Sequence, residues 1–119
     1  MITLYGIPNC QTVKKARNWL QAHNIDFTFV DFKKIPPTST QIHNWLKDVS
    51  INTLLNKKGT TWRKLDSQEQ ERANTTDGAI SLLCQYPSMI KRPVLVQNNQ
   101  PVQLGFSDEM YQNIFSLTD

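Results

Sequence analysis

The sequence predicts an α/β fold in which one sheet is assembled from both ends of the chain. The first observation is a strand–helix–strand pattern over the N-terminal residues, and the second is a strand–strand–helix pattern at the C-terminal end. A strand–helix–strand unit pairs its strands in parallel through a right-handed crossover, and a hairpin adds antiparallel strands to the same sheet. The third observation is the helical periodicity of residues 38–92, which lie between these two patterns.

The N-terminal pattern begins with a short buried strand. Residues 2–5 are mostly apolar or β-branched, and the Gly-Ile-Pro-Asn run at 6–9 ends the strand in a loop. From Cys10 onward, apolar residues recur with helical spacing, and Asn24 suits the left-handed conformation that often ends a helix. Residues 27–32 then alternate aromatic with other side chains and predict the second strand.

The middle of the chain predicts a series of helices. Residues 38–40 are threonine and serine, which cap helix N-termini, and the apolar stripe that follows them is amphipathic. Residues 51–55 predict a short helical turn, whereas residues 56–64 are polar and basic and predict a loop broken by a glycine. Residues 67–75 are typical of a helix, and Asp77 is expected to cap one more helix.

The C-terminal pattern predicts a β-hairpin followed by a helix. Residues 94–96 form an apolar strand, residues 97–100 a polar turn, and residues 101–104 the returning strand. Ser107 is expected to cap the final helix. The complete order corresponds to a thioredoxin-like fold with a helical insertion between its β-α-β and β-β-α halves.

Length and composition agree with one folded domain. The chain has 119 residues, of which 39% are hydrophobic and 19% charged, so bulk disorder is excluded. We expect a single thioredoxin-like domain over residues 1–119, and a monomer. Residues 1–37 and 93–119 form the expected thioredoxin core, and residues 38–92 form the helical insertion.

The net charge of +3 comes with basic residues that occur in doublets. These doublets either form an ordinary solvated surface or converge on an anionic substrate or partner. The chain has no long basic run of the kind found in nucleic-acid-binding arms, so direct nucleic-acid binding is not expected. The doublets are Lys14-Lys15, Lys33-Lys34, Lys57-Lys58, Arg63-Lys64 and Lys91-Arg92.

The chain contains two cysteines, Cys10 and Cys84, which are far apart in the sequence. This excludes a disulfide framework and a zinc pattern, and His23 and His43 have no partners at metal-ligand spacing. The N-terminal apolar run is too short for a signal peptide, and no stretch reaches transmembrane length. We therefore expect a reducing cytoplasmic setting, no bound metal or cofactor, and no membrane association.

Cys10 is the strongest candidate for chemistry because it stands where a loop passes into a helix. The free N–H groups of a first helical turn and the helix dipole both favour an anion, so they lower the pKa of a cysteine thiol there. Lys14 and Lys15, one turn further on, add positive charge. The alternative is a small buried apolar residue, which the polar neighbours Asn9 and Gln11 argue against. A cysteine held as a thiolate is a nucleophile at neutral pH.

Three further residues leave alternatives open. Arg92 is either an ordinary surface charge or an oxyanion clamp that uses its two-pronged guanidinium group. Pro93 is allowed at the first position of a strand, and a trans peptide bond is the ordinary expectation there. Cys84 is expected to pack in the core within an apolar helical pattern, with a role as resolving thiol for Cys10 as the alternative.

Five motifs extend over nearly the whole chain. They are GIPNC (6–10), KKA (14–16), LLNKKGTTWRKL (54–65), PSMIKRPVL (87–95) and GFS (105–107). In this order and spacing they resemble the arsenate reductase/Spx family. Within this family, the chain is most similar to a small branch proposed to act as glutathione-dependent thiol reductases.

The resemblance implies a thioredoxin-like fold in which Cys10 is the nucleophile and Arg92 binds an anion. It also implies a cis peptide bond before Pro93, which would place this proline beside Cys10. The implied activity is that of a cysteine-based thiol–disulfide oxidoreductase that uses glutathione as co-substrate and has glutaredoxin as a candidate partner. The expected substrate-binding residues are Asn9, Lys14, Lys15, Arg92 and Pro93.

The chain departs from this family at positions that define two other activities. Arsenate reductases of the family hold the oxyanion with three arginines, of which two fall on Asn56 and Phe106 here, so that only Arg92 remains. Spx-type regulators carry a Cys-x-x-Cys switch and bind the RNA polymerase α subunit, but the second cysteine position is Val13 here. Arsenate reduction and an Spx-like regulator that binds such a partner stand as alternative functions.

Overall fold

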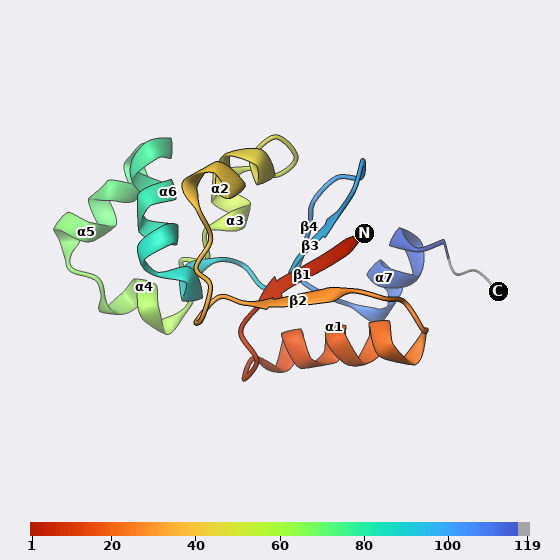
Figure 1. The fold of residues 1–119 in the computed structure, drawn as a ribbon. Coiled ribbons are helices and arrows are strands. Elements are labelled where there is room, and N and C mark those ends of the chain that lie inside the picture. The colour runs from red at the N-terminus through yellow and green to blue at the C-terminus, as the bar shows by residue number, and fades with distance from the viewer. Residues whose placement is uncertain (117–119) are drawn as a thin grey trace. The chain divides into compact units, whose positions relative to one another are not determined.

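The computed structural model describes residues 1–116, and the chain divides into two compact units (Figure 1). The first unit comprises Met1–Val30 together with residues 92–116, and the second comprises Asp31–Lys91. The expected insertion at residues 38–92 begins seven residues later and ends one residue later than the second unit, and its assignment within a single domain stays a prediction. Among the described residues, no helix combines the length and the apolar character needed to cross a membrane.

A four-stranded sheet with the order β2-β1-β3-β4 forms the framework of the first unit. Strand β3 is antiparallel to both β1 and β4, and Figure 1 shows β1 and β2 running in the same direction. The predicted β-α-β and β-β-α halves are therefore confirmed. The strands are β1 (Ile2–Gly6), β2 (Thr28–Asp31), β3 (Val94–Gln97) and β4 (Gln103–Leu104), and α1 (Gln11–Ala22) connects the first two.

The returning strand of the hairpin is shorter than predicted, because only Gln103–Leu104 pairs with β3. The expected strand began at Pro101, which is exposed and has no N–H to donate to a strand partner. Asn99 turns the chain with a positive φ of 60°. The N–H of Gly105 donates to the carbonyl of Pro93 at 2.9 Å, so the far end of the hairpin is held at the start of β3.

One apolar cluster joins the sheet to α1 and to α7 (Asp108–Ile114). Leu4 of β1 lies opposite Leu95 of β3, and both side chains are fully buried. Because α1 and α7 contribute to the same cluster, both helices cover one face of the sheet. The buried members of the cluster are Leu4, Ala16, Trp19, Leu20, Leu95 and Tyr111.

The ends of both helices follow the sequence prediction. Asn24, just after α1, adopts a positive φ of 57°, which is the left-handed conformation expected of it. The hydroxyl oxygen of Ser107 accepts a hydrogen bond from the N–H of Met110 at 3.0 Å and so caps α7. The indole N–H of Trp19 donates to the carboxylate of Asp108, which ties α1 to the first turn of α7.

Tyr111 is the largest fully buried side chain of this core. Its ring meets the rings of Trp19 and Phe106 edge to face, with centroids 5.5 Å and 4.7 Å away. Its hydroxyl has no hydrogen-bond partner among the described residues, and burial raises the pKa of this phenol. A buried hydroxyl without a partner costs free energy, because it gives up its hydrogen bonds to water without replacement.

We therefore expect Tyr111→Phe to raise the free energy of unfolding by about 1 kcal/mol, because it removes the unpaired hydroxyl and keeps the ring contacts. Urea unfolding followed by circular dichroism measures this difference, with Tyr111→Leu as the control that loses the aromatic contacts and is destabilised. A clear loss of stability in Tyr111→Phe would show that the hydroxyl has a partner in solution.

The second unit consists of short helical segments connected by tight turns. The helix α2 begins with a capping box in which the hydroxyl of Thr38 accepts from the N–H of Gln41 and the side chain of Gln41 accepts from the N–H of Thr38. The segments are α2 (Ser39–Trp45), α3 (Ile51–Leu54), α4 (Thr60–Lys64), α5 (Ser67–Glu71), η1 (Arg72–Asn74), α6 (Thr76–Gln85) and η2 (Pro87–Met89).

Two sequence predictions for this unit were wrong. Residues 56–64 were predicted as a loop, but α4 occupies Thr60–Lys64, because Gly59 serves as the N-cap of a helix rather than as a breaker. The amide of Gln70 supports this helix by donating to the carbonyl of Trp62 at 3.0 Å. Asp77 does not cap α6: Thr75 is the N-cap and accepts from the N–H of Gly78 at 3.1 Å, while Asp77 lies in the first turn.

Gly78 is needed because the backbone of Arg72 approaches it too closely to leave room for a side chain. A Cβ atom at Gly78 would lie 2.0 Å from the carbonyl oxygen of Arg72 and 2.9 Å from the hydroxyl oxygen of Thr75. The guanidinium group of Arg72 also donates to Ser81 and Gln85, at 2.7 Å and 3.0 Å, so η1 is fixed against α6 and cannot move away easily.

Gly78→Ala is therefore expected to lower the free energy of unfolding by roughly 1–3 kcal/mol or more, as overpacking does in well-packed interiors. Gly59→Ala is the matched control, because a Cβ atom there would meet Asn56 Nδ2 at an ordinary 3.4 Å and the φ of Gly59 is −82°. Urea unfolding of both variants tests the difference. Equal stabilities would contradict the close approach at Gly78.

Candidate active site

Cys10 is the N-cap residue of α1, with an extended backbone and no side chain acting as a cap. Its N–H donates to the carbonyl of Ile7 at 3.1 Å, and its own carbonyl accepts from the N–H of Lys14 at 2.9 Å. The loop that carries Cys10 packs closely against the protein. Ile7 is buried, and Gly6 lies so close to Val13 that a Cβ atom at Gly6 would be 2.8 Å from a methyl group of Val13. This packing positions Cys10 at the start of the helix.

The environment of Cys10 lowers the pKa of its thiol. Burial opposes this shift because it disfavours the charged thiolate, but the surrounding N–H groups and positive charge outweigh it. The N–H groups of Val13 and Thr12 in the first turn of α1, together with the guanidinium group and positive charge of Arg92, lower the pKa of the thiol. The sequence predicted that the helix N-terminus would stabilise a Cys10 thiolate. In the structure, two backbone N–H groups and the side chain of Arg92 have this effect.

Arg92 reaches Cys10 because of the way β1 pairs with β3. Tyr5 lies opposite Val94, so the residues just before β3 lie beside the point where β1 passes into the Cys10 loop. The Arg92–Pro93 peptide bond is cis, as the family resemblance implied. Pro93 is buried, and Arg92 is half-buried. Arg92 therefore lies beside the candidate nucleophile, and its role in binding an anion stays a prediction.

Asn9, Lys14 and Lys15 are not among the groups that lower the pKa of the Cys10 thiol. Lys14 and Lys15 are exposed on α1, and Lys14 lines a shallow cavity with Arg17, Asn18 and Gln21. Asn9 is exposed in the loop before Cys10. These side chains are accessible to a ligand of the first unit, and their role in binding stays a prediction.

The two positions where the family has further arginines carry other structural roles. Phe106 is half-buried and packs edge to face on Tyr111, so it belongs to the core of the first unit. Asn56 lies in the second unit, where its N–H donates to the carbonyl of Met89 at 2.7 Å and its side-chain oxygen accepts from the N–H of Lys58 at 3.0 Å. Neither residue carries a positive charge.

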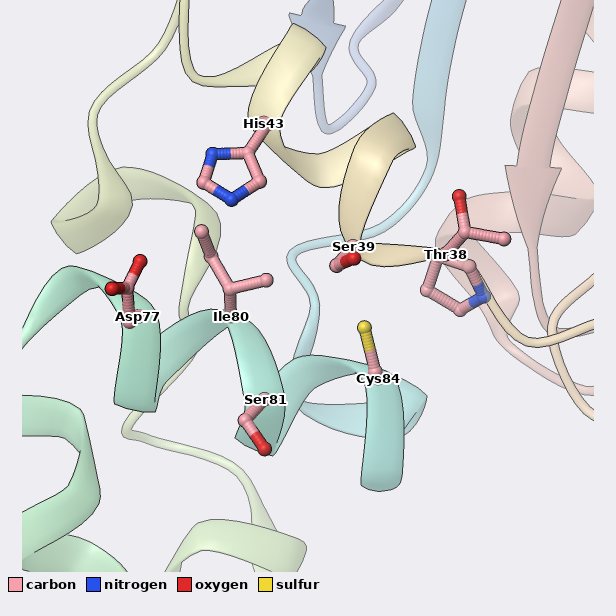
Figure 2. Close-up of a pocket in the computed structure, with 8 residues that line it drawn as sticks. Thr38, Ser39, His43, Asp77, Ile80, Ser81 and Cys84 are labelled. Carbon is pink, nitrogen blue, oxygen red and sulfur yellow. The ribbon is translucent and has the colours of Figure 1, made fainter.

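Cys84 occupies a different environment from Cys10. It is half-buried on α6 and lines a cavity of about 490 Å³ in the second unit, rather than packing in the centre of the core. Figure 2 shows its sulfur directed towards α2, where Ser39 and His43 line the opposite wall. Burial raises the pKa of the Cys84 thiol. Both cysteines are free, and no group of three or more His, Cys, Asp or Glu residues in the described part of the chain is arranged to hold a metal.

The contribution of Arg92 to the thiolate can be tested by the pH dependence of alkylation. We expect Cys10 to react with iodoacetamide at a lower pH than an ordinary cysteine, and Arg92→Gln to move the profile to higher pH, because the charge and hydrogen bond that lower the pKa are lost. Arg63→Gln, which removes an exposed arginine of the second unit, is the control and should leave the profile unchanged. An Arg92→Gln profile identical to that of the wild type would contradict the contact. Cys84→Ser is used throughout so that one thiol is measured.

Comparison with known proteins places the chain among proteins of this architecture. The chain is 38% identical over 116 residues to an uncharacterised protein of Haemophilus influenzae, covering 98% of this chain and 100% of that protein. It is 27% identical over 111 residues to the global transcriptional regulator Spx of Streptococcus pyogenes, covering 92% of this chain and 81% of the regulator.

Solved structures give the same result. A structure described as the YFFB protein superposes with a TM-score of 0.87 at 38% identity, covering 95% of this chain and 97% of that one. An arsenate reductase (ArsC) related protein from Brucella melitensis superposes with a TM-score of 0.72 at 42% identity, covering 96% and 93% of the two chains. The model of the ArsC family matches residues 5–114. The chain therefore belongs to the ArsC family.

Proposed function

We propose that this protein is a cysteine-based thiol–disulfide oxidoreductase in which Cys10 is the nucleophile. The observation that carries the proposal is the position of Cys10 as the N-cap of α1, where the N–H groups of Thr12 and Val13 and the guanidinium of Arg92 lower the pKa of its thiol. These donors increase the thiolate fraction at neutral pH, and the thiolate is the reactive form in disulfide exchange. Membership of the ArsC family supports the same class of chemistry.

The reaction proceeds by two exchanges. The Cys10 thiolate attacks one sulfur of a disulfide, the S–S bond breaks, and the other sulfur leaves as a thiolate, which yields a mixed disulfide on Cys10. An external thiolate then attacks the substrate-derived sulfur of this mixed disulfide and releases the Cys10 thiolate. The external thiol and the substrate sulfur leave as a new disulfide, so each electron pair is accounted for.

An external thiol is needed because the Cys-x-x-Cys partner position holds Val13. Cys84 is not assigned the resolving step, since burial raises the pKa of its thiol and so lowers its thiolate fraction. Glutathione is the proposed co-substrate: it supplies a thiol, and its carboxylates suit Arg92 and the exposed Lys14 and Lys15. Its extended peptide can pair with backbone near Pro93. A reducing, cytoplasmic compartment and a glutaredoxin partner belong to the same proposal.

Reaction with oxidised glutathione tests the proposal. The wild-type protein and Cys84→Ser are expected to gain a single glutathione adduct at neutral pH, and Cys10→Ser none, as measured by intact mass. With excess glutathione, the adduct should be released and oxidised glutathione recovered. Adduct formation that persists in Cys10→Ser would refute Cys10 as the nucleophile. Failure of glutathione to release the adduct would refute only the choice of co-substrate.

Arsenate reduction is a second candidate because one structural relative is described as arsenate reductase related. It would require Arg92 to hold a highly charged tetrahedral anion without the two arginines that Asn56 and Phe106 replace. We expect at most a small arsenate-dependent oxidation of glutathione, because each missing guanidinium removes a two-pronged charge-assisted contact. An assay coupled through glutaredoxin and glutathione reductase measures this, and robust turnover abolished by Cys10→Ser would reverse the order of the two candidates.

An Spx-like regulator is a third candidate, supported by the relative of that name. Binding of a partner such as the RNA polymerase α subunit would not depend on a thiol switch at Cys10, since Val13 replaces the second cysteine. Co-purification of the α subunit with Cys10→Ser as efficiently as with the wild type would favour this candidate over the enzyme.

A further inference from the structure

A second cavity lies within the helical unit and is lined by three lysines. Its volume is about 380 Å³, which falls within the range of pockets that hold small molecules. Among the described residues, no acidic side chain lines it. The lining residues are Asn52, Thr53, Leu55, Asn56, Lys57, Lys58 and Lys91.

The lysines come from two chain segments that the backbone holds side by side. Leu55 and Ile90 form an antiparallel bridge. The N–H of Asn56 donates to the carbonyl of Met89 at 2.7 Å, and the N–H of Lys91 donates to the carbonyl of Leu54 at 2.8 Å. These bonds fix the segment that precedes Lys57 and Lys58 against the segment that ends with Lys91. The backbone therefore brings three lysine residues, from two segments that are separated in the sequence, to the lining of one cavity.

The polar groups of the cavity are mostly hydrogen-bond donors. Each lysine carries three N–H groups and no acceptor. The side-chain oxygen of Asn56 already accepts from the N–H of Lys58, which leaves the NH₂ end of this amide as a donor. The side chain of Lys57 is supported by an aromatic ring, because its Nζ lies 5.2 Å from the ring centroid of Trp62.

The charge of this cavity favours an anionic ligand. Three lysines line it, and no carboxylate among the lining residues offsets their positive charge. An anionic ligand also supplies acceptors for the N–H groups of lysine and asparagine. Charge and hydrogen bonding therefore favour the same class of ligand.

We propose that this cavity binds a small molecule with at least two anionic oxygen groups, either carboxylates or phosphates. Such a ligand would place its charged groups against Lys57 or Lys58 on one side and Lys91 on the other, with Asn56 donating between them. The site does not use Cys10, so it stands or fails independently of the proposed thiol chemistry.

The experiment titrates the full-length Cys10→Ser protein with two probes and maps binding by backbone amide NMR. Inorganic pyrophosphate represents phosphate ligands, and S-methylglutathione represents dicarboxylates without a free thiol. We expect saturable shifts of the amides of residues 55–58 and 91 with at least one probe, and binding that weakens as salt concentration rises. The probe that binds more tightly identifies the source of the anionic groups.

Two charge-matched variants decide whether the cavity or the general basic surface is responsible. Lys57→Gln/Lys58→Gln/Lys91→Gln removes the lining charges, and Lys33→Gln/Lys34→Gln/Lys47→Gln removes three exposed lysines of the same unit that do not line it. We expect the first variant to weaken binding at least about tenfold, which is about 1.4 kcal/mol or more, and the second less than about twofold.

Equal weakening by the two variants would overturn the proposal, because it would show nonspecific attraction to a basic protein. Absence of saturable shifts at these residues with both probes at millimolar concentration would also overturn it. All six lysines are exposed, so loss of folding is not expected, and the NMR spectrum of each variant verifies this. Binding of S-methylglutathione that shifts only residues 9–15 would support the Cys10 site and contradict this one.

Discussion

The antiparallel pairing of β1 with β3 is the constraint on which both the core and the candidate site of the first unit depend. In this register Leu4 lies opposite Leu95 within the apolar cluster, and Tyr5 lies opposite Val94. β1 then passes into the loop of Cys10, while Arg92 lies two residues before β3. A slip of one residue would turn the buried side chains to the other face of the sheet and would move Arg92 away from the thiol. Stability and chemistry therefore select the same register.

The two cysteines show how local surroundings decide the behaviour of one residue type. Both are half-buried, and burial by itself raises the pKa of each thiol. At Cys10, two N–H groups of α1 and the guanidinium of Arg92 reverse this effect, because all three interact favourably with a negative sulfur. Cys84 has no such reversal. A thiolate therefore forms more readily at Cys10, which makes it the residue suited to nucleophilic attack.

Asn56 and Phe106, the two positions that the family resemblance assigns to further arginines, have structural roles in this chain. Phe106 packs against Tyr111, and the side-chain oxygen of Asn56 accepts from the N–H of Lys58. Lys57, Lys58 and Lys91 line a cavity of the helical unit. Lysine and arginine differ in geometry, since an ammonium group is a point charge and a guanidinium group is a two-pronged fork.

The sequence by itself determined the order of strands and helices, the start of α1 at Cys10, its left-handed end at Asn24 and the cap at Ser107, because each follows from local periodicity or capping chemistry. It did not determine that Gly59 begins a helix or that Thr75 rather than Asp77 caps α6, since competing local signals are resolved by packing, as at Gly78 against Arg72. Only the tertiary structure brought Arg92 next to Cys10, where it lowers the pKa of the thiol. Arg92 and Cys10 are far apart in the sequence. They come together because β1 pairs with β3, and this long-range pairing cannot be inferred from a local sequence pattern.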